Sequence, residues 1–254
     1  MASIMQALTE GVALTWNRFS RFWVSGLLLT LAMTLYVFND IVFDILGDTV
    51  FTSEAAQTLL LLSSLGVDFL SIVALILIAL WTYTTALSTL RGSEDPRVDG
   101  PRMLWTLVFS VLYAFTMGVI GFGIILMMVI GISLAVTLGM AGSFLPAILI
   151  GMGTAVFMLA TLLLLAYLGI RLLILVQVVI ADTGQNPFAA MAASWKLSSK
   201  NVLGLFGLWV MISLLNFAGM SALWFGLVFT LPASYVVLAH YYEQLRAERE
   251  PVGP

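Results

Sequence analysis

The sequence predicts an all-α membrane protein, a polytopic bundle of transmembrane helices. Of its 254 residues, 61% are hydrophobic and only 9% are charged, whereas soluble domains carry roughly 25% charged residues. Six apolar runs are each long enough to cross a bilayer, for which about 20 residues suffice. The basic residues fall in alternate connections between these runs. These observations exclude a soluble globular domain and also a disordered chain, because disordered chains are poor in apolar residues.

The six predicted spans follow one another with short connections. They are residues 22–46, 58–80, 103–139, 144–181, 202–219 and 222–242. The third and fourth are nearly twice as long as a bilayer requires, so an alternative divides them into four shorter crossings, eight in all. We expect a single integral membrane domain, residues 1–254. It would comprise an N-terminal part (1–90), a long central hairpin (103–181) and a C-terminal part (187–245).

The central hairpin carries a stripe of small residues on each of its two helices. The stripes are Gly131, Ala135 and Gly139 before the turn, and Ala147, Gly151 and Ala155 after it. A spacing of four places small residues on one helix face, where they let two backbones approach closely. We therefore favour two long packed helices, although glycine and alanine are common in membrane helices generally.

The distribution of lysine and arginine predicts the orientation. Nine of the ten basic residues lie before the first span, between the second and third, between the fourth and fifth, or after the sixth. The other connections, residues 47–57, 140–143 and 220–221, contain none. Because cytoplasmic loops are enriched in basic residues, both termini are predicted to be cytoplasmic.

Two short segments are predicted to be amphipathic helices in the cytoplasmic membrane interface. In the first, apolar residues from Met5 to Phe19 recur at intervals of three and four, which is typical of such helices. The second begins with Asn186 as cap and Pro187 at the first helical position. The predicted aromatic anchors are Trp16, Phe19, Phe188 and Trp195. Each segment precedes a two-span hairpin, which indicates a parallel internal repeat.

The second of these segments resembles a bacterial inner-membrane family. The residues that carry the resemblance are Ala181-Asp182-Thr183-Gly184, Asn186-Pro187-Phe188-Ala189-Ala190, Ser194-Trp195-Lys196-Leu197-Ser198 and Asn201. The run is similar to a signature of YciC-like proteins and of the membrane domain attached to some glycerophosphodiester phosphodiesterases. The resemblance covers roughly residues 165–245, is weak over 1–90 and fails over 120–160. It implies a multi-pass protein of the bacterial inner membrane and assigns no reaction.

Two charged residues are predicted to lie near the middle of the bilayer. Asp68 falls about ten residues into the second span, and Arg171 about ten residues before the end of the fourth. Because a lone charge is costly at that depth, such residues usually face inward and pair. We expect an Asp68–Arg171 ion pair that fixes helix register, with an ion or substrate pathway as the alternative. Asp40, Asp44 and Asp48 form an acidic stripe, interpreted as a solvated surface rather than a cation site.

The remaining chemistry is sparse. The chain has no cysteine and one histidine, which excludes thiolate and multi-histidine metal sites. It contains no nucleotide-binding loop or catalytic motif, and its net charge of −3 does not favour nucleic acid. We therefore expect no catalytic residue, metal or cofactor. The predicted function is non-catalytic assembly, as a scaffold or accessory subunit, with membrane lipids, other subunits or a second copy as partners. The alternative is a transporter or flippase of a lipid or small apolar solute.

Overall fold

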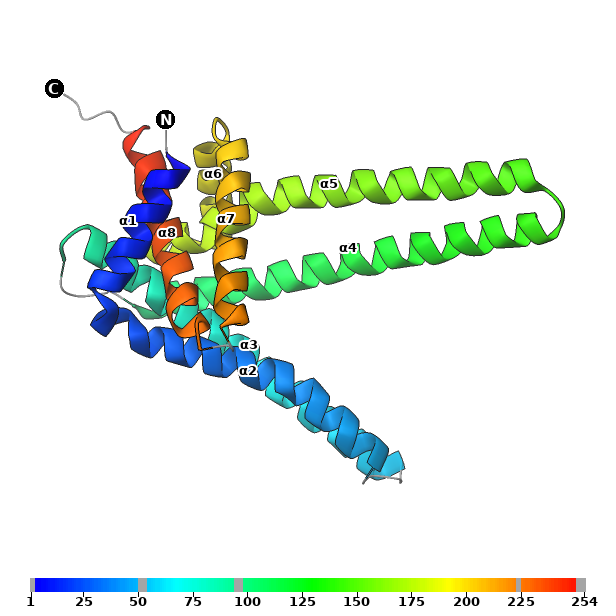
Figure 1. Ribbon diagram of the computed structural model, residues 1–254, viewed down its shortest axis with the longest axis horizontal. Helices are drawn as coiled ribbons and strands as arrows, with labels where there is room; N and C mark the ends of the chain where they lie inside the picture. Colours follow the sequence, from blue (N-terminus) through cyan, green and yellow to red (C-terminus); the bar gives the residue numbers. More distant parts are fainter. Residues whose placement is uncertain (1–2, 50–53, 94–97, 223–224, 250–254) are drawn as a thin grey trace.

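The computed structural model describes residues 3–49, 54–93, 98–222 and 225–249. Across these ranges the chain is all-helical and contains no strand, which confirms the predicted class. The helices, in order, are α1 (Ile4–Asn17), α2 (Phe19–Thr49), α3 (Glu54–Leu90), α4 (Gly100–Met140), α5 (Phe144–Thr183), α6 (Pro187–Ser198), α7 (Val202–Ser221) and α8 (Leu227–Ala247). Figure 1 shows two long hairpins, α2–α3 and α4–α5, that extend in different directions from a region containing α1, α6, α7 and α8.

Helix α8 lies at the centre of the compact region. It packs against α1, α2, α3, α5, α6 and α7, and twelve of its 21 residues are buried. Its sequence allows this because apolar and small residues occur on every side of the helix, as in a helix surrounded by others. The core joins α8 residues such as Val236 and Tyr241 to Leu175 and Val179 of α5 and to Leu205 of α7.

Pro232 and Gly26 together explain how closely α2 approaches α8. Proline lacks an N–H, so Pro232 cannot donate the usual helical hydrogen bond to the carbonyl of Val228. A Cβ atom at Gly26 would overlap that same carbonyl oxygen and would lie 3.1 Å from Pro232 Cγ. The absence of a side chain at Gly26 therefore lets the α2 backbone lie directly against the carbonyl that proline leaves unbonded.

The membrane-spanning capacity of the helices differs from the six-span prediction. Five helical segments in the described residues are long and apolar enough to cross a bilayer: Phe19–Phe43, Leu61–Leu90, Gly100–Met140, Phe144–Gly169 and Val202–Ser221. Helix α8, the predicted sixth span, is not among them. It carries His240, Glu243 and Arg246 in its C-terminal half, and its apolar residues are largely covered by neighbouring helices. The chain is thus a multi-pass membrane protein by composition, and the predicted count of six spans is not confirmed.

The central region consists of two long helices and not four short ones. Helix α4 runs continuously for 41 residues and α5 for 40. A short turn through Ala141 and Gly142 connects them, with Gly142 in the left-handed region at φ 78°, where glycine is favoured. Thus, the alternative of four crossings in this region is not what the structure shows.

The fully buried positions of α1 and α6 are mostly small residues. Those of α1 are Ala7, Gly11 and Thr15, four residues apart. Those of α6 are Pro187, Ala190, Ser194 and Ser198. The predicted apolar faces are divided: Leu8, Val12 and Met191 are partly buried against the core, whereas Met5, Trp16 and Phe188 are exposed. The predicted start of α6 is confirmed, since Asn186 Oδ1 accepts from Ala189 N at 2.9 Å and Pro187 opens the helix.

Candidate functional site: a polar junction at the ends of α3, α5 and α8

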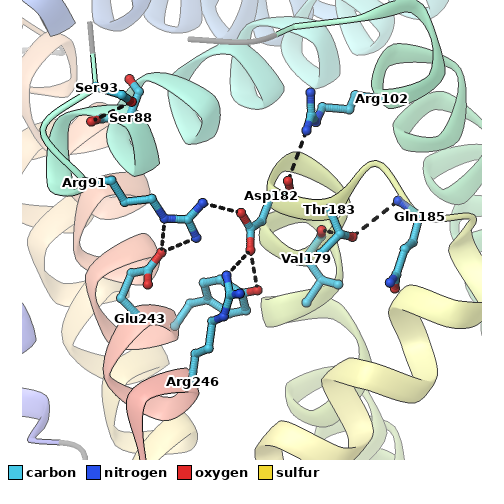
Figure 2. A network of polar contacts seen from close by, with 11 residues as sticks. Ser88, Arg91, Ser93, Arg102, Val179, Asp182, Thr183, Gln185, Glu243 and Arg246 are labelled. Atoms are coloured by element: carbon cyan, nitrogen blue, oxygen red, sulfur yellow. Dashed lines mark hydrogen bonds and ion pairs between the residues drawn. The ribbon is translucent and has the colours of Figure 1, made fainter. Parts of the chain in front are cut away.

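The main polar site of the described residues is centred on Asp182, in the last turn of α5. Its side chain is only 5% exposed, so the carboxylate needs partners to offset the loss of water. Arg91, which follows α3, donates to Oδ1, and Arg246 of α8 donates to Oδ2 at 2.9 Å. Tyr242 Oη also donates to Oδ2 at 2.9 Å. Figure 2 shows Arg91 and Arg246 approaching Asp182 from two sides.

Two further contacts extend this network to the neighbouring helices. Arg91 also pairs with Glu243 of α8, through both Nε and Nη2. Arg102, in the first turn of α4, donates to the backbone carbonyl of Asp182 at 3.1 Å. Asp182, Glu243, Arg91 and Arg246 contribute two charges of each sign. We call these four residues and Tyr242 the junction; together they connect the ends of α3, α5 and α8.

The local sequence explains why α5 ends just after Asp182. Gly184 adopts φ 67° and closes the helix, and its N–H donates to the carbonyl of Ile180. A left-handed residue of this kind is the common way to end a helix, and glycine adopts it without steric cost. The last turn of α5 therefore stops beside α8, and Asp182 points toward Arg246.

The electrostatic environment of Asp182 disfavours proton transfer. Burial raises the pKa of its carboxyl. The hydrogen bonds from Arg91 and Tyr242, with the charges of Arg91 and Arg246, outweigh burial and leave the pKa below its ordinary value. A general base needs a pKa near the working pH. The lowered pKa of Asp182 and the three donors on its carboxylate therefore suit the junction to holding helices together.

A second set of contacts attaches α1 to α8. Gln244 Oε1 accepts from the backbone N–H of Ser3 at 2.9 Å, and His240 Nε2 lies 2.9 Å from Glu10 Oε2. A Cβ at Gly11 would come within 2.7 Å of Val237 Cγ2. The start of α1 and the end of α8 are therefore adjacent, which places the two ends of the described chain at one end of the molecule (Figure 1).

The structure does not bring Asp68 and Arg171 together. Asp68 lies on α3 within the α2–α3 hairpin, where Oδ1 accepts from Asn39 Nδ2 of α2 at 2.8 Å. No ion pair joins the two among the described residues, and the predicted pair is corrected accordingly. The depth estimate assumed straight, parallel spans, but α3 and α5 diverge from the core in different directions (Figure 1).

Arg171 is instead buried between α5 and α6. Its guanidinium donates to Tyr167 Oη at 2.8 Å, to the Trp195 carbonyl at 3.1 Å and to Ser198 Oγ at 3.3 Å. Its Cζ lies 3.5 Å from the centroid of the Trp195 ring, close enough for a cation–π contact. Ser194 Oγ donates to the Arg171 carbonyl at 2.7 Å. Neutral polar and aromatic groups therefore satisfy this cation.

The predicted small-residue stripes form part of the α4–α5 contact. A Cβ at Gly131 would collide with the side chain of Thr154, and one at Gly139 would lie 3.9 Å from Ala147 Cβ. Gly151, in contrast, has nothing within 4 Å of such a Cβ, and Ala155 is exposed. Ala135 is half-buried. Thr154, which lies between Gly151 and Ala155 in sequence, is the α5 residue that faces Gly131 of α4. The prediction had assigned that facing position to small residues.

The four predicted aromatic anchors are exposed, but three also make specific contacts. Trp16 packs edge-on against Phe229 of α8 with ring centroids 5.5 Å apart. Phe19, the first residue of α2, contacts the same Phe229 ring with centroids 6.4 Å apart. Phe188 is 72% exposed on α6. Trp195 is 40% exposed and covers Arg171. Their exposure suits contact with lipid, which stays a prediction. The side chains of Asp40, Asp44 and Asp48 lie outside those that the structure describes.

Arg91, Arg102 and Arg246 are among the nine basic residues whose positions predict the orientation, and their contacts with Asp182 were not predicted. A signal for the junction was present, since Asp182 stands in the segment that carries the family resemblance and ends a predicted span on the same side as the basic connections. Compared with protein-family models, curated proteins and solved structures, the chain matches none of them. The resemblance to YciC-like proteins therefore stays a prediction.

Proposed function

We propose that this chain is a non-catalytic membrane protein that acts by assembly, with other membrane-protein subunits or with a second copy. The observation that carries this proposal is the uncovered length of the α4–α5 hairpin. Thr106 and Phe109 are the buried residues of α4, both near its start. None of the most apolar window in α4 or in Phe144–Gly169 is buried by the rest of the chain.

The length of the hairpin exceeds what a bilayer can cover. The apolar part of α4, residues 103–139, would be about 55 Å long at 1.5 Å per residue, against a hydrocarbon core of about 30 Å. A straight helix of that length would need a tilt of nearly 60°, whereas membrane helices tilt by about 20° on average and up to about 40°. A bilayer alone would leave apolar surface in water, and a protein partner would cover it.

The polar site supports the same proposal. Three donors of the junction contact the Asp182 carboxylate, and its lowered pKa makes it a poor proton acceptor. The transporter alternative drew on Asp68 and Arg171 sharing a pathway, and these residues contact different helices. We therefore retain assembly over transport. The bacterial inner membrane as location, with both termini cytoplasmic, remains part of this proposal and draws on the basic residues and the resemblance.

Photo-crosslinking in native membranes tests the proposal. A photo-reactive amino acid replaces Phe122 on α4, which is 68% exposed, and in a matched control replaces Phe217 on α7, which is 67% exposed. Helix α7 has 20 residues, a length that a bilayer covers. We expect a defined protein adduct from position 122, with lipid adducts dominating at position 217. Lipid adducts alone at both positions would contradict assembly through the hairpin.

A further inference from the structure

A cavity of about 680 Å³ opens where α5, α6 and α8 end and α7 begins. Its lining is rich in cations: Lys196, Lys200, Arg246 and Arg249, with Glu248 as the one carboxylate. Val179, Ala193 and Leu197 provide an apolar wall beside these charges. The cavity adjoins the junction, because Arg246 and Tyr242 belong to both.

We infer that this cavity binds the phosphate-bearing headgroup of an anionic phospholipid. Basic pockets between membrane helices recognise such headgroups, and arginine and lysine are the residues that bind phosphate. The inference is independent of whatever partner covers the α4–α5 hairpin.

The charges in the cavity are only partly compensated by the protein. Arg246 is paired with Asp182, and Arg249 donates to Ser199 Oγ at 2.8 Å. Lys196 and Lys200 have no ion pair among the described residues, and both are exposed. An anion in the cavity would find two unpaired ammonium groups with two guanidinium groups nearby.

The apolar wall favours a lipid over free phosphate. A free phosphate ion would use the cations alone, whereas a phospholipid also brings glycerol and acyl groups that can lie against Val179, Ala193 and Leu197. The outward face of α6 continues this surface with Phe188 and Trp195, which are 72% and 40% exposed. Aromatic side chains of this kind are favoured at the level of lipid headgroups.

Stabilisation of helix ends is the competing explanation for the basic residues. Lys196 and Arg246 lie in the last turns of α6 and α8, where cations interact favourably with the helix dipole. That explanation does not extend to Lys200 and Arg249, which follow the last residues of those helices. The two explanations predict different results when the basic residues are replaced. If they stabilise helix ends, replacement lowers thermal stability and leaves lipid preference unchanged; if they bind lipid, replacement lowers the lipid preference.

The test uses the full-length protein in neutral detergent and native mass spectrometry with two lipids, phosphatidylglycerol and phosphatidylcholine. The cavity variant is Lys196→Gln with Lys200→Gln. The matched control is Arg18→Gln with Arg21→Gln, which removes the same charge from two exposed residues near the start of α2. Arg249→Gln, a lining residue from the end of the chain beyond α8, provides a second cavity variant, and inorganic phosphate serves as a competitor.

We expect wild-type protein to bind one phosphatidylglycerol on the order of tenfold more tightly than phosphatidylcholine. The cavity variant should lose most of that preference, Arg249→Gln should lose part of it, and the control should keep it. Equal losses in the cavity variant and the control would mean diffuse attraction and would overturn the site. Displacement of the lipid by millimolar inorganic phosphate would overturn the lipid as occupant. A lower melting temperature in the cavity variants with an unchanged lipid preference would overturn the inference in favour of helix-end stabilisation.

Discussion

The α4–α5 hairpin and the region around α8 contain similar small and apolar residues, but the two regions differ in how much of their surface the rest of the chain buries. Twelve of the 21 residues of α8 are buried by other helices, whereas the most apolar parts of α4 and α5 are not buried at all. The α8 region also contains the ion pairs of the junction. In the α8 region, the chain itself buries the apolar surface and pairs the charges. In the hairpin, lipid or a protein partner must cover the apolar surface.

The glycines show the same difference. In the α8 region, a Cβ at Gly26 would overlap the Val228 carbonyl oxygen, and one at Gly219 would collide with Thr230. In the hairpin, Gly118, Gly123 and Gly151 have nothing within 4 Å of such an atom. Glycine is therefore a packing requirement around α8, while at most positions of the hairpin it is not demanded by the fold of the single chain.

The largest expected effect comes from breaking the junction. Asp182→Asn removes a buried charge that two arginines share, and losing one partner of a buried pair costs about 3–5 kcal/mol. Because the Arg91 and Arg246 side chains are each 40% exposed, we expect the lower end, about 3 kcal/mol. Thermal unfolding in mild detergent measures it.

The control for this prediction is Asp99→Asn. Asp99 pairs with Arg102 three residues away, and its side chain is 53% exposed. Asparagine keeps the helix cap, because Asp99 Oδ1 accepts from the Arg102 N–H. An exposed pair of this kind contributes about 0–1 kcal/mol. Equal losses of stability in the two variants would contradict a structural role for the junction.

The next effect contrasts two glycines. Gly26→Ala places a methyl group against the Val228 backbone carbonyl, and overpacking of this kind costs about 1–3 kcal/mol. Gly151→Ala on α5 meets open space and should be neutral or stabilising by up to about 1 kcal/mol, since alanine is the better helix former. Unfolding midpoints of the two variants provide the comparison. Destabilisation by Gly151→Ala would show that a partner occupies that face of the hairpin in the purified protein.

A smaller free energy, the coupling between Asp68 and Arg171 in a double variant, tests whether these two residues interact. Arg171→Leu removes three hydrogen bonds and the contact with Trp195, and Asp68→Leu removes the hydrogen bond from Asn39. Because the two residues share no partner, the losses of stability should add within about 0.5 kcal/mol in the double variant. Recovery of stability in the double variant would restore the predicted ion pair.

The sequence allowed the order of the helices, the approximate ends of α4 and α5 and the start of α6 to be predicted, because these depend on local signals. Apolar run length placed α4 and α5, and the cap and proline at Asn186 and Pro187 placed the start of α6. The predicted hairpins correspond to α2–α3, α4–α5 and α7–α8. What could not be predicted is the direction in which each hairpin leaves the core, and the Asp68–Arg171 pair depended on that direction.

The packing faces of α1 and α6 show a second limit. Hydrophobic periodicity selected the large apolar residues of each helix, and part of that face, including Leu8, Val12 and Met191, packs against the core. The most deeply buried positions are small ones, such as Gly11 and Ser194. Small residues let two helix backbones approach closely, and the periodicity of large apolar residues does not identify them.

The smallest expected effect is the pH dependence that the junction contributes. Burial raises the pKa of Asp182, but the hydrogen bonds from Arg91 and Tyr242, with the charges of Arg91 and Arg246, lower it by more, so the folded value lies below the ordinary 3.8. A carboxyl whose folded pKa is lowered stabilises the protein above its unfolded pKa and loses that contribution as the pH falls through the folded value. The melting temperature should therefore change little near neutral pH and fall below about pH 4. In Asp182→Asn the decline should be shallower, because that variant has no carboxyl to protonate at the junction. Parallel declines in the two proteins, recorded in the same detergent, would show that other groups dominate acid unfolding and that the junction contributes equally at all pH values.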